Sequence, residues 1–177
     1  MFKSLTKLFG HQPNPTAAWP PSTQTELVYD LRARSLNGVK LNARVEAIKI
    51  FGPSEHFKLR DTDLDIYYRE AGLILGLADD EFLSVTLVVS RASYLFREKQ
   101  MGVCAPVVID GEGRRHVLTD ASTLPDLSLC FGQPAVSKPA GDEMLHQFKT
   151  LKNCVDASHD LKTGKLLSLD ICETNDA

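Results

Sequence analysis

Three groups of residues in this sequence have types and spacings that could support chemistry. The first is the run Asp61, Asp63 and Asp65, which begins like a calcium-binding loop. Such a loop needs glycine at its sixth position and a bidentate glutamate at its twelfth, but Ile66 and Gly72 stand there. We interpret the run as a polar loop entering a strand, and predict no metal and no cofactor.

The second group is the glycine-rich segment Gly111-Glu112-Gly113, followed by Arg114 and Arg115, which resembles a phosphate-binding turn. A strand follows this segment, so no helix N-terminus is available to favour an anion. A hairpin turn with exposed arginines is therefore the favoured interpretation.

The third group comprises the histidines and cysteines, none of which has metal-ligand or Cys-x-x-Cys spacing. His146 could meet Asp160 or His159 across neighbouring strands. Cys–His catalysis stays open for Cys104 or Cys154, although a lone buried thiol is more common. No Gly-x-Ser-x-Gly nucleophile turn is present. We therefore predict that the chain is not an enzyme.

The other cysteine interpretations concern packing. Cys130 and Cys172 lie among apolar residues, which is typical of small core side chains. Cys154 and Cys172 flank a predicted hairpin and could face each other. A disulfide needs an oxidising compartment, so free thiols are favoured.

The elements that carry these residues predict an α+β fold of two tandem repeats, residues 24–92 and 105–173. Each repeat is expected to contain a β-hairpin, a short helix and a three-stranded antiparallel meander. Asn37-Gly38 is a strong hairpin turn, and Phe51-Gly52-Pro53 and Phe131-Gly132-Gln133-Pro134 are helix ends. Helices are predicted after Asn42 and after Thr123. The predicted strands span residues 27–34, 39–41, 64–69, 73–77, 82–90, 107–109, 117–118, 144–150, 153–159 and 165–172.

Three further segments flank or join the repeats. Residues 1–23 comprise an amphipathic segment and a proline-rich arm, in which we expect Trp19 to be tucked against the body. Residues 93–104 form a connector, and residues 174–177 form a tail. Units of about 65 residues are marginally stable alone, so the halves are expected to share a core or a continuous sheet.

The composition excludes some classes of partner. A net charge of −3 argues against nucleic acid. No run of about 18 apolar residues is present, so no stable membrane insertion is predicted, and the cytoplasm is the default location.

The charge is unevenly distributed. Residues 51–90 contain eight acidic and three basic side chains, whereas residues 1–50 contain three acidic and seven basic ones. Charge runs are usually solvated surface, but an acidic face could also meet a basic partner. The candidate partner-binding residues are Asp61, Asp63, Asp65, Asp79, Asp80 and Glu81.

The tandem plan resembles inhibitors of the beta-lactamase-inhibitor kind, and resembles less well the single-unit lipoproteins of outer-membrane assembly. The unit Asn37-Gly-Val-Lys-Leu41, Phe51-Gly-Pro53, Gly72-Leu-Ile-Leu-Gly-Leu77 also resembles small bacterial immunity proteins. The resemblance implies a non-enzymatic protein that neutralises a cognate toxin or effector by occluding it. An adaptor subunit of a secretion or envelope machine and an enzyme with a pocket between the repeats are the alternatives.

Overall fold

The computed structural model describes residues 13–90, 95–96, 99–150 and 153–173. The predicted amphipathic segment at the N-terminus and the tail at residues 174–177 lie outside this part of the chain. The fold is α+β and mostly β, as the sequence predicts, with one short α-helix and two main sheets.

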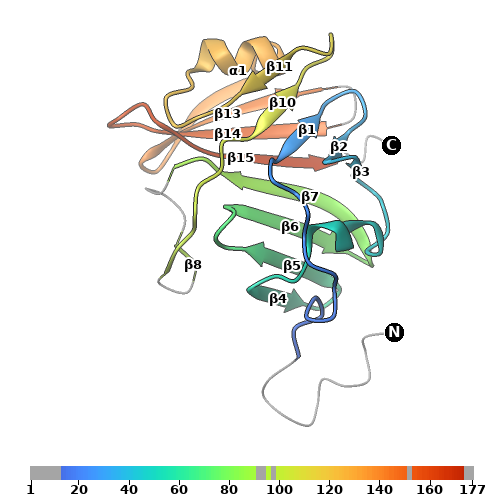
Figure 1. Cartoon of the computed structure of the whole chain (residues 1–177). Helices are drawn as coiled ribbons and strands as arrows, with labels where there is room; N and C mark the ends of the chain where they lie inside the picture. Colours follow the sequence, from blue (N-terminus) through green and yellow to red (C-terminus); the bar gives the residue numbers. More distant parts are fainter. Residues whose placement is uncertain (1–12, 91–94, 97–98, 151–152, 174–177) are drawn as a thin grey trace.

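The larger sheet, sheet B, is an eight-stranded antiparallel sheet formed by two four-stranded meanders (Figure 1). The two meanders join where β7 pairs with β15, so the expectation of one continuous sheet is correct. Its strands are β4 (His56–Arg60), β5 (Asp63–Tyr68), β6 (Leu73–Ala78), β7 (Glu81–Val88), β12 (Val136–Ala140), β13 (Glu143–Lys149), β14 (Asn153–Asp160) and β15 (Leu166–Glu173).

The smaller sheet, sheet A, has five strands in the order β11-β10-β1-β2-β3. Strands β1 and β10 run parallel and come from opposite halves of the sequence, and the other pairs are antiparallel. The strands are β1 (Val28–Asp30), β2 (Ser35–Leu36), β3 (Val39–Lys40), β10 (Val107–Ile109) and β11 (Arg115–Val117). A separate two-stranded ribbon is formed by β8 (Leu95–Phe96) and β9 (Lys99–Gln100).

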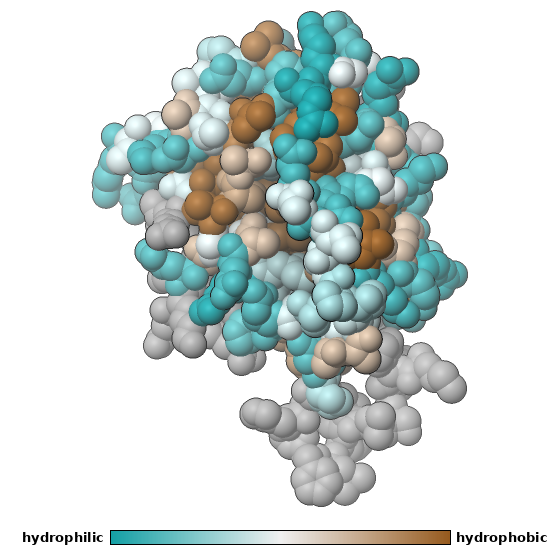
Figure 2. Space-filling model, in the orientation of Figure 1, coloured by the Kyte–Doolittle hydropathy of each residue, from teal (hydrophilic) through white to brown (hydrophobic). Residues whose placement is uncertain are grey.

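Sheet A and two helices, η1 (Ala47–Phe51) and α1 (Leu124–Phe131), cover one face of sheet B (Figure 1). A single apolar cluster fills the space between these layers, and Tyr29, Phe82 and Phe148 are fully buried in it. The covered side of the molecule shows apolar patches between hydrophilic strips (Figure 2). One core therefore serves both halves of the chain.

The predicted three-stranded meanders are wrong, because each contains a fourth strand at its outer edge. The missed strands β4 and β12 lie at the two ends of sheet B. All five residues of β12 are exposed, and Pro139 lies within it. Edge strands need no apolar alternation and tolerate proline, so their sequences resemble loops.

The predicted strand at residues 27–34 is also too long, because β1 ends at Asp30. The Asp30 carboxylate accepts hydrogen bonds from the backbone N–H groups of Arg32 and Ala33, at 2.8 and 2.9 Å. Arg34 then adopts a left-handed conformation, with φ of 50°. The local aspartate turn therefore overrides the alternating pattern and starts β2.

The first predicted helix is a short 3₁₀-helix, and Asn42 does not cap it. Asn42 donates its backbone N–H to Phe82 O at 2.6 Å, and Val45 donates to Asp80 O at 3.0 Å. These bonds, with the bridge between Arg44 and Glu81, tie residues 42–45 to the start of β7, so η1 begins only at Ala47. By contrast, α1 follows Thr123 and ends at Gly132, as the sequence predicts.

The proline-rich arm packs on the body rather than serving as a free linker in its described part. Thr16 is fully buried, and its hydroxyl accepts the backbone N–H of Ser54 at 2.8 Å. Asn14 donates its side-chain amide to Ser54 O at 2.8 Å. Trp19 packs against the core cluster, which confirms the expectation for this residue.

Candidate functional site

Five of the six predicted acidic contact residues meet at one end of sheet B. Asp63 is the cross-strand partner of Ala78, and Ala78 is the partner of Glu81. The β4–β5 turn and the β6–β7 turn therefore lie at the same end of the sheet. We call the six residues the acidic end: Asp61, Asp63, Asp65, Asp79, Asp80 and Glu81.

The sixth member, Asp65, lies further along β5. Its side chain is half-buried on the face of sheet B opposite the core, and Tyr67 donates its hydroxyl to it at 3.4 Å. Lys58 and Arg60 are the cross-strand partners of Asp65 and Asp63. No salt bridge within 4.0 Å involves any of the six carboxylates in the described part of the chain.

Turn geometry explains three of these acidic residues without invoking a binding partner. Asp79 and Asp80 form the two-residue β6–β7 turn, with φ of 48° and 67°. Such a turn requires two consecutive positive φ values, which asparagine, aspartate and glycine tolerate best. Asp61, in the β4–β5 turn, also has a positive φ, 47°, which aspartate tolerates better than most residues. The turns therefore favour aspartate, whereas the absence of paired cations does not follow from turn geometry.

His146 meets His159 rather than Asp160. Their rings lie edge to face with centroids 5.3 Å apart, and both side chains are buried. His146 Nδ1 is 2.8 Å from Ser137 Oγ, and His159 Nε2 is 3.1 Å from Ser122 O. Burial lowers the pKa of both histidines, and the neighbouring charge of His159 lowers the pKa of His146 further. No carboxylate bonds to either ring among the described residues, so the Ser137–His146 pair has no orienting acid.

The cysteines do not form a nucleophilic pair with histidine in the described part of the chain. Burial raises the pKa of Cys104 to about 12 and that of Cys154 to about 11, so both are protonated near neutral pH. Cys154 and Cys172 are directly opposite each other on β14 and β15, as predicted for the hairpin, and both are free thiols.

The glycine-rich turn is organised by Asp110, which the sequence analysis did not single out. This buried carboxylate accepts hydrogen bonds from the backbone N–H groups of Glu112 at 2.8 Å and Arg114 at 2.9 Å. It also accepts the side-chain Nε–H of Arg114 at 2.7 Å and forms a hydrogen bond of 2.9 Å with His116 Nε2. The His116 bond is the largest cause that holds the pKa of Asp110 well below its usual range. Arg114 is therefore occupied, and the hairpin interpretation is confirmed. An aspartate at the first position of a turn was the available signal.

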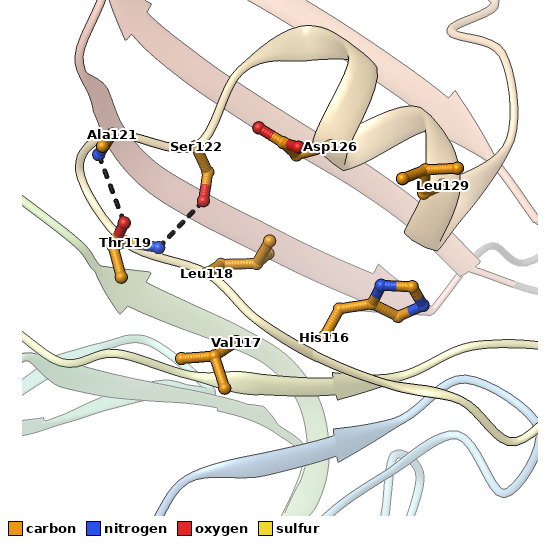
Figure 3. Close-up of a pocket in the computed structure, with 8 residues that line it drawn as sticks. All are labelled: His116, Val117, Leu118, Thr119, Ala121, Ser122, Asp126 and Leu129. Carbon is orange, nitrogen blue, oxygen red and sulfur yellow. Dashed lines mark hydrogen bonds between the residues drawn. The ribbon is translucent and has the colours of Figure 1, made fainter.

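A groove of about 340 Å³ lies between β11 and α1 (Figure 3). Val117 and Leu129 line it, and each is 61% exposed, the largest value among the large apolar side chains described. Its polar groups are engaged locally: Asp126 Oδ2 accepts the N–H and the hydroxyl of Thr123, both at 2.7 Å. Ser122 Oγ accepts the Thr119 N–H at 3.0 Å. The groove thus presents an apolar rim without a free acid.

No group of three or more His, Cys, Asp or Glu side chains is arranged to hold a metal ion in the ranges that the structure describes. In the same ranges, no helix has the length and apolar character needed to cross a membrane.

Comparison with known proteins gives one distant structural match. No family model matches the chain, and no curated protein matches it. A crystal structure of an extracellular protein containing an SCP domain, from Bacillus anthracis str. Ames, matches with a TM-score of 0.48 and 8% identity. The match covers 75% of this chain and 44% of that protein, so the chain spans less than half of its length.

These findings correct the family resemblance drawn from the sequence. The structural match is to an extracellular protein containing an SCP domain, and no inhibitor or immunity family model matches the chain. The resemblance to beta-lactamase-inhibitor and immunity proteins is therefore wrong, because it relied on turn and strand signals that many sheets share. At this TM-score the match supports no statement about activity, and the cytoplasmic location stays a prediction.

Proposed function

We propose that the chain is a non-enzymatic binding protein whose acidic end docks on a basic surface of a protein partner. The observation that carries this proposal is the gathering of six carboxylates on neighbouring strands and turns without a salt bridge in the described residues. Turn chemistry accounts for aspartate at particular positions. It does not account for the lack of compensating cations within 4.0 Å.

The rigidity of the acidic end supports a docking role. The β6–β7 turn is fixed by backbone bonds, because Val45 donates to Asp80 O at 3.0 Å and Phe82 donates to Ala43 O at 2.8 Å. An acidic surface on a rigid sheet attracts a basic partner before contact. At low salt this attraction increases the association rate by roughly 10- to 1,000-fold. Occlusion of a toxin or effector, and service as an adaptor, are two forms that such binding can take.

The test uses charge reversal on the acidic end. The full chain, tagged, is used to capture partners from its host, and the association rate of the purified partner is then measured by biolayer interferometry. Asp61→Lys combined with Asp79→Lys is expected to reduce that rate about tenfold and to weaken its salt dependence. Asp142→Lys is the matched control, because Asp142 is an exposed carboxylate without a salt bridge in the other meander. Equal rates for both variants would refute the acidic end as the docking surface.

We also propose that the two halves arose by duplication. Gly52 and Gly132, which end the two helices, have nearly the same backbone angles, φ 78° and ψ −172° against φ 83° and ψ −166°. The phenylalanine before each glycine packs on a ring in the second strand of its own meander. That ring is Tyr68 in one half and Phe148 in the other, with centroid distances of 6.3 and 5.4 Å. An experimental structure in which the halves fail to superpose strand for strand would contradict the duplication.

A further inference from the structure

A larger pocket, of about 1020 Å³, lies between the two halves of the chain. Leu31, Arg32 and Arg34 from the β1–β2 turn line one side, and Gly111 lies in the β10–β11 turn. The end of α1 and the β13–β14 end of sheet B close the remaining sides. Its volume is close to the upper end of the range, roughly 300–1,000 Å³, of sites that hold small organic ligands.

The charged side chains that line this pocket, among the residues that the structure describes, are all positive. They are Arg32, Arg34 and Lys149. Arg34 is partly compensated by Glu173, with Nη1 and Oε1 3.0 Å apart. The side chains of Arg32 and Lys149 have no hydrogen bond or ion pair with any residue in the described ranges. Two cations are therefore available to a ligand.

The backbone that presents the arginines is fixed in advance. Asp30 Oδ1 accepts the N–H groups of Arg32 and Ala33, and Leu41 donates its N–H to Arg34 O at 2.9 Å. Arg34 is held in the left-handed region, with φ of 50°. A ligand that binds here does not need to order this turn, which lowers the entropic cost of binding.

The floor of the pocket is apolar. Leu31, Cys130 and Phe131 contribute to the lining, and the ring of Phe131 is anchored on Phe148 with centroids 5.4 Å apart. Burial raises the pKa of Cys130 to about 12, so its thiol is neutral and adds no charge near neutral pH. The arrangement combines an apolar floor with cations at the rim.

We propose that this pocket binds a small amphipathic anion, with a carboxylate, sulfonate or phosphate head group and an aromatic or aliphatic body. Arg32 and Lys149 would pair with the head group, and Leu31 and Phe131 would contact the body. The competing explanation is that these cations only complement the carbonyl end of α1, whose last turn contains no basic residue. This site is separate from the acidic end, so the proposal is tested independently of the proposed function.

The experiment compares two dyes that differ in charge. The probe is 8-anilinonaphthalene-1-sulfonate, and the neutral comparison is N-phenyl-1-naphthylamine, both titrated by fluorescence against the full chain at low salt. One saturable site is expected for the sulfonate, with an affinity about tenfold above that of the neutral dye. Arg32→Glu and Lys149→Glu are each expected to weaken the sulfonate about tenfold and to leave the neutral dye unchanged.

The matched control is Lys138→Glu, which reverses an exposed cation on β12 that forms no ion pair in the described part of the chain. Its sulfonate affinity is expected to stay at the wild-type value. Circular dichroism confirms that each variant is folded, and Arg32→Gln provides a smaller change with an intermediate expected loss. The proposal is overturned if the two dyes bind equally, if no saturable site exists, or if Lys138→Glu weakens the sulfonate as much as Arg32→Glu.

Discussion

His146 and His159 pack edge to face inside the molecule, with ring centroids 5.3 Å apart. They lie on neighbouring strands, two residues apart in register, because His146 pairs with Ala157 and His159 pairs with Met144. Nδ1 of His159 is buried and has no hydrogen-bond partner among the described residues. A proton on this ring would add a charge to a site that offers only Ser122 O at the other nitrogen.

The first prediction is that acid destabilises the fold through this pair. Burial lowers both pKa values, so the unfolded chain binds more protons than the folded chain once the pH falls below the ordinary histidine value of about 6.5. Stability is therefore retained above that pH and is lost progressively below it. The urea concentration at the midpoint of unfolding should therefore decrease as the pH is lowered from about 8 to about 5.5.

A variant separates this pair from other titrating groups. His159→Leu removes one buried imidazole and is expected to flatten the dependence of the urea midpoint on pH, whatever its effect on stability at neutral pH. An identical slope in His159→Leu and the wild type would exclude the pair as the cause.

The second prediction concerns the contact between the two sheets. Asn153 Nδ2 donates to Tyr29 OH at 2.8 Å, and both residues are fully buried. Tyr29→Phe leaves this amide without a partner, which is expected to cost about 1–3 kcal/mol of unfolding free energy. Asn153→Leu leaves the tyrosine hydroxyl unpaired instead.

The double variant Tyr29→Phe/Asn153→Leu provides the control. It removes both polar partners, so its loss should be smaller than the sum of the single losses by about 0.5–3 kcal/mol. Chemical denaturation of the four proteins in the cycle measures this difference. Additive losses would mean that the bond contributes no coupling between β1 and β14.

Sequence patterns predicted the elements whose register is fixed by a buried face. Strand β6 is almost wholly apolar, and β7 alternates, so both were predicted within one or two residues. Strands β4 and β12 lack this signal, because each lies at an edge of sheet B and pairs with a neighbouring strand along one edge only. The end of β1 depends on a side-chain bond from Asp30, which competes locally with the strand pattern. The parallel pairing of β1 with β10 joins distant segments and has no local signal at all.

The candidate sites were predicted unevenly for similar reasons. The acidic residues fall in two short runs of the sequence, 61–65 and 79–81, and the pairing of β5 with β6 and of β6 with β7 brings the two turns to one end of sheet B. The cation-lined pocket joins Arg32 to Lys149, which are far apart in the chain, and its prediction required the pairing of the two sheets. The role of Asp110 depends on contacts from Glu112, Arg114 and His116, whereas the sequence interpretation considered the glycines and arginines of this segment and not the carboxylate before them.

The third prediction concerns the close passage of the connector past the β5–β6 turn. A Cβ atom on Gly102 would lie 2.8 Å from the carbonyl carbon of Glu70, and one on Gly72 would lie 2.8 Å from Gly102 O. Gly102→Ala therefore forces the two backbones apart. It also disturbs the bond from Gly102 N to Arg69 O, which is 2.7 Å long. We expect a loss of about 2 kcal/mol in chemical denaturation.

The control for this variant is a glycine with open space around it. Gly111 has no atom within 4 Å of a built Cβ and no positive φ, so Gly111→Ala should change stability by less than about 0.5 kcal/mol. The packing of Met101 beside Tyr67 and Ile74 provides a second measurement, because displacement of the connector should expose it to oxidation by hydrogen peroxide. Normal stability and a protected Met101 in Gly102→Ala would contradict the close passage.

The fourth prediction concerns the aromatic pair that supports the end of α1. Phe148 is fully buried on β13 and packs on Phe131, which also contributes to the floor of the cation-lined pocket. Phe148→Ala should cost about 3–5 kcal/mol of unfolding free energy, because it removes a large buried ring and leaves a cavity. Phe148→Leu retains more of the volume and should cost less. Leu129→Ala, at a side chain that is 61% exposed, should cost under about 0.5 kcal/mol. If Phe148→Leu leaves stability intact but weakens binding of the anionic dye, the ring is needed mainly to position Phe131. If Phe148→Leu instead loses stability but binds the anionic dye as the wild type does, the pocket floor does not depend on this contact.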